Sequence, residues 1–523
     1  MTGIMQNNPD TESKRARRCV LRPFLKDILE KGEMKRMKPH VIMIMADQLR
    51  ADVLGKGFTP NIDAIAKEGV KFDRAYCGCP LCVPARGVIF TGTYPNRNGS
   101  LINPWEPEDA KYGNVKSGIT NLYELMEEEW DSIHSGKQHL FTEGGKLEDR
   151  KDSKTRWLST EQSYKEYLKE NGISMPGGPS FRMRVPELIS GKATHVANYS
   201  NANTGRYEPG EEYYFDHYFA KKAVEGIRGR DPLKPLLLNA MFLAPHPPLE
   251  IPDPWYSLVK DTDFDLPGNV GVYYSNQSPL QMYNLPGVVG ACYNRAHWKE
   301  AWRVYLGLVA MLDNCVGQIR KELKAQGIYE ESLIIFTSDH GEMLGSHGLF
   351  QKMCMYEEAA RVPLYIKFPK EKNPGRPGQV IKSTVSHVDL MPTLCNYLEL
   401  KPGHEMDGES LIPLISGNGK PDKGGRAFLQ YDGNGSLSNF QRCVVRGNHK
   451  LIMDFFKDEV YYELYDLDQD GQETCNLLFQ PEYDSLAREI AAELARHMTA
   501  TGDHLDFPAF SPERFRKAYG GRA

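Results

Sequence analysis

The clearest chemical pattern in the chain lies within residues 77–95. Cys82–Arg86 has the spacing Cys-x-Pro-x-Arg, in which a proline turn leads into a predicted helix over Ala85–Phe90. The turn places Cys82 at the N-terminus of that helix, where free backbone N–H groups and the helix dipole favour an oxyanion. Five residues are a short pattern, and a buried free thiol beside a proline turn also fits it, so its meaning depends on the rest of the chain.

Two dipeptides of metal-ligand type, Asp47-Gln48 and Asp339-His340, each come directly after a short apolar run. Such runs are typical of strands buried on both faces of a largely parallel sheet. Ligands bind beyond the carboxyl ends of these strands, so we expect the four side chains to converge at one sheet edge. Mostly oxygen donors favour a hard divalent cation. The alternative for either dipeptide alone is that its Asp caps the following helix.

Ten cysteines occur in a chain without a recognisable signal peptide, so we expect mostly reduced thiols rather than a disulfide framework. Cys79 and Cys82 also have C-x-x-C spacing. A zinc ribbon needs a second such pair, and the sequence has none. A thioredoxin-like redox pair is an alternative, although that pair belongs to a much smaller α/β unit.

The bulk composition argues against several classes of function. The 523 residues include 64 Lys and Arg against 69 Asp and Glu, and no long run of one sign occurs. We therefore expect neither a nucleic-acid partner nor a polybasic membrane contact. No apolar stretch approaches the ~20 residues of a membrane span. Residues 1–36 are polar and lack the apolar core of an export signal, which predicts an N-terminal extension on a cytoplasmic protein.

Strands and helices alternate along most of the chain, which predicts an α/β fold. We expect a large central sheet, mostly parallel or mixed and sandwiched by helices, over residues 37–416. Glycines and prolines then mark a boundary, and residues 417–523 are predicted to form a smaller α+β subdomain of antiparallel sheet plus helix. The predicted strands are 40–46, 236–244, 332–337, 362–369, 426–431, 443–445, 450–453 and 463–467, and the main helices are 61–69, 120–129, 220–228, 298–323 and 389–397.

Residues 143–215 interrupt this alternation. They are polar, rich in Lys, Gly and Tyr, and only weakly periodic. We interpret them as an insertion or a long loop region that shapes a substrate pocket.

Taken in order, the motifs resemble those of the type I, formylglycine-dependent sulfatases of the alkaline phosphatase superfamily. The resemblance runs from about Lys38 to the C-terminal helix, which is nearly the whole chain. One such match is weak, whereas an ordered series is specific. The matching segments are Asp47-Gln48, Cys82–Arg86, Gly136–His139, His246, Asp339–Gly341, Gly345–Gly348, Lys352, Glu463–Leu467 and Glu473–Leu477.

The resemblance implies a modified residue and a metal. In this family a maturation enzyme oxidises the cysteine of the pattern to formylglycine, and the hydrated aldehyde is the nucleophile. The family's usual ion is Ca²⁺. Here Gln48 and His340 stand where other members have Asp and Asn, which leaves room for manganese or zinc. The implied ligands of the one divalent cation are Asp47, Gln48, Cys82 (as formylglycine), Asp339 and His340.

The resemblance also assigns roles in catalysis. Arg86, Lys137 and Lys352 offset the charge on the transferring group, together with the metal. His246 protonates the leaving alcohol as general acid. His139 takes a proton from the remaining hydroxyl of the hydrate, which expels sulfate. Taken singly, a His among prolines is more often structural, and a lone Lys is more often a solvated side chain.

Several further residues are of types that bind substrates or support a metal site. His347 is interpreted as orienting the loop on the metal side. The others are each more often surface or packing residues, and we assign no role to them: Arg50, Asn103, Trp105, His217, Arg295 and His297.

The sequence therefore predicts a sulfuric ester hydrolase. Its substrate is a sulfated small molecule, and the Tyr-rich, basic insertion favours a sulfated saccharide. A phosphonate monoester or phosphodiester hydrolase of the same superfamily is the nearest alternative, although the pair Lys137 and His139 favours a sulfatase. An inactive sulfoglycan-binding protein, in which Cys82 is never oxidised, is an alternative of another class. No feature of the sequence indicates an oligomeric state.

Overall fold

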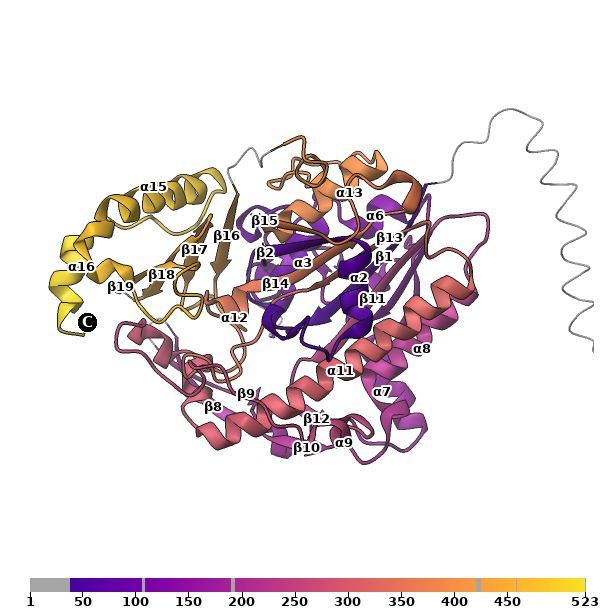
Figure 1. Cartoon of the computed structure of the whole chain (residues 1–523), viewed down its shortest axis with the longest axis horizontal. Helices are drawn as coiled ribbons and strands as arrows, with labels where there is room; N and C mark the ends of the chain where they lie inside the picture. Colours follow the sequence, from indigo (N-terminus) through magenta and orange to yellow (C-terminus); the bar gives the residue numbers. More distant parts are fainter. Residues whose placement is uncertain (1–37, 106–108, 190–192, 420–424, 458, 523) are drawn as a thin grey trace, which may run out of the picture. The chain divides into compact units, whose positions relative to one another are not determined.

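The computed structural model describes residues 38–105, 109–189, 193–419, 425–457 and 459–522 (Figure 1). The predicted N-terminal extension, residues 1–36, lies outside these ranges. From His40 onward the chain forms one compact unit. Within the described part, no helix is both long enough and apolar enough to cross a bilayer.

An eight-stranded sheet forms the centre of the structure, in the order β15-β2-β14-β13-β1-β11-β4-β7. Every neighbouring pair is parallel except the two that involve β14, which runs antiparallel to β13 and β2. The prediction of a mostly parallel or mixed sheet is therefore confirmed. The strands are β1 (His40–Asp47), β2 (Val70–Tyr76), β4 (Asp131–Gly136), β7 (Arg156–Ser159), β11 (Leu236–Pro245), β13 (Ser332–Ser338), β14 (Arg361–Lys367) and β15 (Gln379–Ser386).

Strands β1 and β13 lie in the middle of the sheet, and all of their residues are buried. Their sequences are continuous apolar runs because both faces of the sheet are covered and no position is left for a polar, solvent-facing side chain. Each run ends in an Asp at its carboxyl end or directly after it. The interior strands thus fix where the first polar groups of the site emerge.

Two groups of helices accompany the sheet (Figure 1). The long helix α11 (Arg295–Ala325) packs against α2 (Pro60–Glu68) and α8 (Phe215–Arg228). The helix α3 (Cys82–Thr91) packs instead against α6 (Leu122–Met126) and α13 (Leu390–Leu398). The predicted α/β architecture is confirmed, although α6 is shorter than the helix expected over residues 120–129.

The segment predicted as an insertion or long loop, residues 143–215, is more regular than its sequence suggested. It contributes the edge strand β7 to the central sheet and continues into α7 (Glu161–Glu170). It then forms the antiparallel hairpin of β8 (Arg182–Ile189) and β9 (Ala193–Ser200). The loop interpretation was wrong because a four-residue edge strand and a partly exposed hairpin leave only weak periodicity in the sequence.

The C-terminal part contains the predicted small antiparallel sheet. Its four strands are paired in sequence order, and α15 (Asp484–Ala500) packs against β17 and β18. The predicted domain limits at residues 37, 416 and 417 stay a prediction. The strands are β16 (Arg426–Tyr431), β17 (Gln441–Arg446), β18 (His449–Phe456) and β19 (Glu459–Asp466), and the chain ends in α16 (Pro512–Tyr519) and a short 3-10 turn.

Candidate active site

Four strand ends bring polar side chains to one edge of the central sheet. The last residues of β1 and β13 are aligned, so Asp47 and Asp339 leave their strands side by side. Asp47 also pairs with Pro245 at the end of β11, which places His246 next to it. The end of β4 is paired with β11, and Lys137 follows directly. The convergence predicted from the apolar runs is therefore present.

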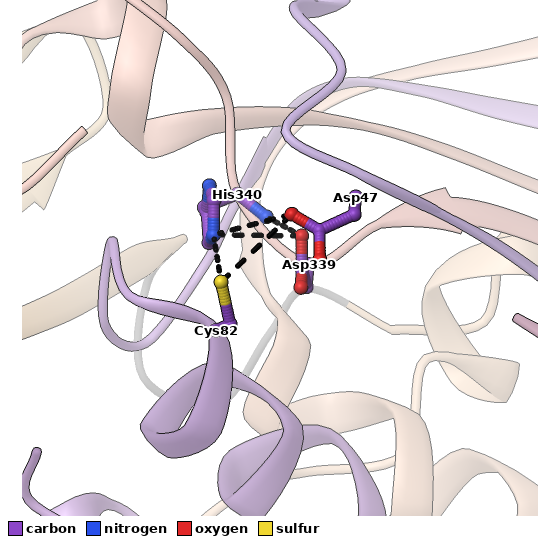
Figure 2. A group of neighbouring side chains, drawn as sticks. All are labelled: Asp47, Cys82, Asp339 and His340. Carbon is purple, nitrogen blue, oxygen red and sulfur yellow. Dashed lines mark hydrogen bonds and ion pairs between the residues drawn. The ribbon is translucent and has the colours of Figure 1, made fainter. Parts of the chain in front are cut away.

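Cys82 is the first residue of α3, as the proline turn predicted. It is 2 % exposed, and its Sγ lies 3.1 Å from Nε2 of His340 and 3.8 Å from Oδ1 of Asp47 (Figure 2). Burial and Asp47 raise the pKa of this thiol, but the positive side chains of Lys137 and Lys352 outweigh them and the net shift is downward. Cys82 thus occupies a water-excluded, electropositive position at a helix N-terminus.

Four residues from three separate segments form a donor set that suits a metal ion. One possible ligand atom from each of Asp47, Cys82, Asp339 and His340 lies within 4.8 Å of the others (Figure 2). Two carboxylates and an imidazole, with the atom at position 82, match the preferences of a divalent cation. Burial alone would raise the pKa of Asp47, but Lys137, His246 and Arg86 hold it well below its usual value. The residues present therefore fit the implied metal.

Arg86 and Lys137 surround the same two carboxylates. Arg86 lies one helical turn after Cys82, is fully buried, and donates from Nε to Oδ2 of Asp339 at 3.2 Å. Its Nη1 donates to the backbone carbonyl of Lys137 at 2.6 Å, and Lys137 Nζ donates to Asp47. Two cations thus face two carboxylates in the protein interior, and the catalytic roles expected of Arg86 and Lys137 stay a prediction.

Gln48 takes part in a neighbouring contact. Its backbone is in the left-handed region, with φ of 68°, and its N–H donates to Asp339 Oδ1 at 3.2 Å. Its side-chain oxygen accepts from Lys352 Nζ, and its side-chain nitrogen donates to Glu342. These contacts place Lys352 next to the donor set. The assignment of Gln48 as a metal ligand stays a prediction.

His246 is partly buried and lies beside the donor set. Its Nδ1 lies 2.6 Å from the backbone carbonyl of Pro247, which fixes the ring. Burial, Lys352 and Lys137 lower its pKa well below the ordinary value of histidine. The buried carboxyl of Asp216 accepts hydrogen bonds from two backbone N–H groups just before this residue, at 2.7 and 3.1 Å. Asp216 thus anchors the end of β11, and sequence reasoning missed it.

His139 has a partner that the sequence did not reveal. Its Nε2 lies 3.0 Å from Oε2 of Glu161, the first residue of α7. Its Nδ1 is buried and has no hydrogen-bond partner among the residues that the structure describes. Burial raises the pKa of Glu161, but His139 and Lys137 hold it well below its usual range. Glu161 was missed because it lies in the segment predicted as a loop.

The other cysteines give no support for a redox pair. The nine described cysteines are all free thiols. Burial, with Cys77 and Asp432, raises the pKa of Cys79 well above its usual value, whereas that of Cys82 is lowered. Both side chains are also buried, whereas a cysteine that exchanges disulfides needs an accessible thiol.

His347 lies outside the donor set. Its ring stacks on Tyr356, with centroids 4.0 Å apart, and its Nδ1 lies 3.2 Å from Oε1 of Gln277. The orienting role inferred from the sequence stays a prediction.

Family comparisons agree with this site. The sulfatase family matches residues 39–400, and the C-terminal region of N-sulphoglucosamine sulphohydrolase matches residues 345–500. The first match covers well over half of the chain, so the protein belongs to the sulfatase family, within the alkaline phosphatase superfamily. It is therefore an enzyme of the hydrolase class.

Individual relatives span nearly the whole chain. The arylsulfatase of Clostridium perfringens is 26 % identical over 468 residues, which cover 86 % of this chain and 92 % of that protein. The N-acetylglucosamine-6-O-sulfatase of Bacteroides thetaiotaomicron is 25 % identical, with 88 % and 86 % covered. The solved structure of a phosphonate monoester hydrolase from Agrobacterium radiobacter has a TM-score of 0.69 at 23 % identity and covers 89 % of this chain and 96 % of its own. That likeness concerns the fold alone.

Proposed function

We propose that this enzyme hydrolyses sulfate esters of a saccharide, with a formylglycine made from Cys82 and one divalent cation, Ca²⁺ in the first instance. The saccharide is supported by the carbohydrate sulfatase among its relatives. The proposal requires a maturation enzyme as a partner, since the oxidation of a buried thiol to an aldehyde is not a spontaneous step. The cytoplasmic location expected from the sequence stays a prediction.

The proposed nucleophile would form at Cys82, the first residue of α3. Oxidation would replace Sγ of Cys82 by an aldehyde oxygen, whose hydrate offers a hydroxyl to the sulfur atom of the substrate. A divalent cation held by Asp47, Asp339, His340 and residue 82 would supply electrostatic stabilisation of the negative charge on the transferring group. The N-terminus of α3 adds its free N–H groups and dipole at the same point.

Three cationic side chains bind and orient the sulfate. Arg86 and Lys137 contact the carboxylates of the donor set, and Lys352 reaches the same place through Gln48. All three are at most 3 % exposed, so water does not screen their charge. A sulfate monoester brings one negative charge on the transferring group, which these groups can hold through the reaction.

His246 is placed to protonate the leaving alcohol. The surrounding lysines lower its pKa, so the imidazole is mainly neutral before the substrate binds. An anionic sulfate ester next to the ring favours the protonated form, because an opposite charge at short range stabilises a cation. Proton uptake would thus be coupled to substrate binding, and the proton would then pass to the ester oxygen as the bond to sulfur breaks.

His139 and Glu161 form the second acid–base pair. Glu161 fixes Nε2 of His139, which leaves the unpartnered Nδ1 as the nitrogen that can accept a proton. Removal of a proton from the remaining hydroxyl would expel sulfate and restore the aldehyde. The carboxylate stabilises the imidazolium that forms, as in other pairs of this type.

The single observation that carries the proposal is the convergence of Cys82 with Asp47, Asp339 and His340 at the end of α3. An assay of matched aryl sulfate and aryl phosphonate esters tests the function. We expect a higher kcat/KM for the sulfate, and loss of both activities in Cys82→Ala. A preference for the phosphonate would contradict the proposal, since the fold is shared by both classes. No turnover of either ester by protein from its native host, with Cys82 left as a thiol, would favour the inactive binding protein.

A further inference from the structure

One exposed aromatic ring lies close to the site. Trp105 is 42 % exposed, and none of the other five tryptophans, all within the described residues, is exposed to this degree. Its ring centroid lies 5.2 Å from that of Tyr199 and 6.2 Å from that of His195, both on β9. Tyr199 and His195 hold this indole in place, so it offers a fixed apolar surface to a ligand.

The backbone that carries Trp105 is tied to the nucleophile. Oδ1 of Asn103 accepts the N–H of Val83, the residue after Cys82, at 3.0 Å. The backbone carbonyl of Asn103 accepts the N–H of Gly435 at 3.0 Å. Trp105 is two residues further along, so its backbone lies within ~8 Å of that of Asn103. Trp105 therefore belongs to the segment that contacts the N-terminal turn of α3.

A second set of contacts links Trp105 to Met353, the residue after Lys352. A Cβ atom on Gly435 would lie 2.3 Å from Cε3 of Trp105, so only glycine allows the indole to lie against this loop. The adjacent Asn434 contacts Sδ of Met353 at 3.4 Å, and the N–H of Met353 donates to Pro80 at 3.1 Å. The indole is therefore positioned by contacts on both sides of Cys82.

We propose that Trp105 is a specificity-determining residue that stacks against a pyranose ring of the substrate at the rim of the active site. This inference rests on the proposed sulfatase function. The apolar C–H face of a pyranose matches an exposed indole face. Tyr199 supports the ring from behind, with its hydroxyl donated to Glu187 at 3.3 Å.

The same ring does not fit the other ligand class that aromatic groups recognise. A quaternary ammonium such as choline binds best inside a cage of several aromatic faces that exclude water. Tyr199 and His195 pack directly against Trp105, with centroids 5.2 and 6.2 Å from that of the indole, so these rings do not enclose a space for an ammonium group. The surroundings therefore favour a hydroxylated ring over a choline headgroup.

The test compares Trp105→Ala and Trp105→Phe with wild type on three substrates: a disaccharide that carries N-acetylglucosamine 6-sulfate, choline sulfate and 4-nitrophenyl sulfate. We expect KM for the disaccharide to rise about 5- to 10-fold in Trp105→Ala and less in Trp105→Phe, since an aromatic contact of this type is worth roughly one order of magnitude in binding. KM for choline sulfate should stay within about twofold. Tyr283→Ala is the matched control, since Tyr283 is 46 % exposed and stacks on Phe456 of the C-terminal sheet.

A binding measurement separates the stacking contact of Trp105 from catalysis. Calorimetry of the disaccharide with Cys82→Ala and with Cys82→Ala/Trp105→Ala should show the same loss of affinity without turnover. Equal changes in KM for all three substrates, or a larger change for choline sulfate, would contradict the stacking role of Trp105. If wild type turns over 4-nitrophenyl sulfate but neither binds nor hydrolyses the disaccharide, the stacking role of Trp105 is wrong and the sulfatase function stands. If oxidised wild type hydrolyses none of the three, the proposed function itself is wrong.

Discussion

Two buried clusters of charged side chains differ in their balance of charge. The central cluster comprises Asp47, Arg86, Lys137, Asp339 and His340, and the C-terminal cluster comprises Glu357, Lys450, Asp454, Glu463 and Glu473. In the central cluster, two carboxylates face Arg86 and Lys137. In the C-terminal cluster, which has four carboxyl groups, Lys450 lies 2.7 Å from Glu357 and 2.8 Å from Glu473, and Arg361 Nε lies 3.3 Å from Glu357.

The two clusters respond to burial in opposite ways. The pKa of Asp47 is held well below its usual value, because nearby cations overcome the effect of burial. Burial instead raises the pKa of Asp454 and Glu463 to about 7 and that of Glu473 to about 8. Burial therefore does not decide the protonation state; the number of nearby cations does. Within the C-terminal cluster, Glu357 follows the same rule, because burial would raise its pKa but its two cationic neighbours, Lys450 and Arg361, lower it.

Removal of a cation from the central cluster should have the largest effect. Arg86→Met leaves Asp47 and Asp339 with one cation fewer in a fully buried position. We expect kcat/KM for an aryl sulfate to fall by about 10³-fold or more, since Arg86 also orients the transferring group. Stability should fall by ~3–5 kcal/mol, as for other broken buried pairs. Arg156→Met is the control, because Arg156 pairs with Asp131 near the surface of the same sheet. Equal losses in the two variants would contradict the comparison.

Metal removal tests whether the central cluster, rather than the C-terminal cluster, binds the divalent cation. A chelator should abolish sulfatase activity and lower the melting temperature, and excess Ca²⁺ should restore both. A cation at about 100 times its Kd stabilises the folded state by ~2.7 kcal/mol. Asp339→Asn should lose most of this calcium-dependent shift, whereas Glu473→Gln should keep it. A chelator-induced shift that persists in Asp339→Asn would place the ion elsewhere.

The pair of His139 and Glu161 should give a smaller effect. Glu161→Gln keeps the hydrogen bond to the ring but removes the charge that stabilises the imidazolium. We expect kcat to fall by about 10-fold, a fraction of the 10²–10⁴ that a general base contributes. KM should change little, because Glu161 does not contact the sulfate. Single-turnover kinetics should show slow release of sulfate with normal release of the alcohol. A slow alcohol step would show that His139 acts elsewhere.

The smallest effect concerns stability and pH in the C-terminal cluster. Burial raises the pKa of Asp454 to about 7, which favours the protonated carboxyl in the folded protein. Its Oδ2 accepts a hydrogen bond from Ser278 Oγ at 2.7 Å. A carboxyl with a raised folded-state pKa stabilises fully below its unfolded pKa, and this stability is lost as pH rises to about 7. Asp454→Asn should therefore gain roughly 2–4 kcal/mol relative to wild type between pH 4.5 and 8. Denaturant unfolding at several pH values measures this, and a constant difference would mean that Asp454 is ionised.

The sequence allowed part of this site to be predicted, for a physical reason. Asp47 and Asp339 follow apolar runs, and parallel strands in the middle of one sheet end at the same edge. The position of Cys82 at a helix N-terminus followed from the proline turn. Each of these features depends on a short segment of sequence, and the strand order of the sheet then brings the segments together.

The supporting residues could not be predicted in the same way. Glu161, Asp216 and Glu342 act through contacts with residues 22 to 294 positions away, and nothing in their own segments marks them. Trp105 carried no signal of its role, because exposure depends on the surrounding loops rather than on its neighbours in sequence. The C-terminal cluster is likewise invisible until β18, β19 and α12 (Glu357–Ala360) are brought together.

The most direct test of the account is the chemical state of residue 82. Mass spectrometry of the peptide that contains Cys82, from protein made in its native host, measures this without any assumption about the substrate. We predict a peptide in which the thiol has been replaced by an aldehyde or its hydrate, while Cys77 and Cys79 in the same segment remain thiols. An unmodified Cys82 in protein that still hydrolyses sulfate esters would contradict the account.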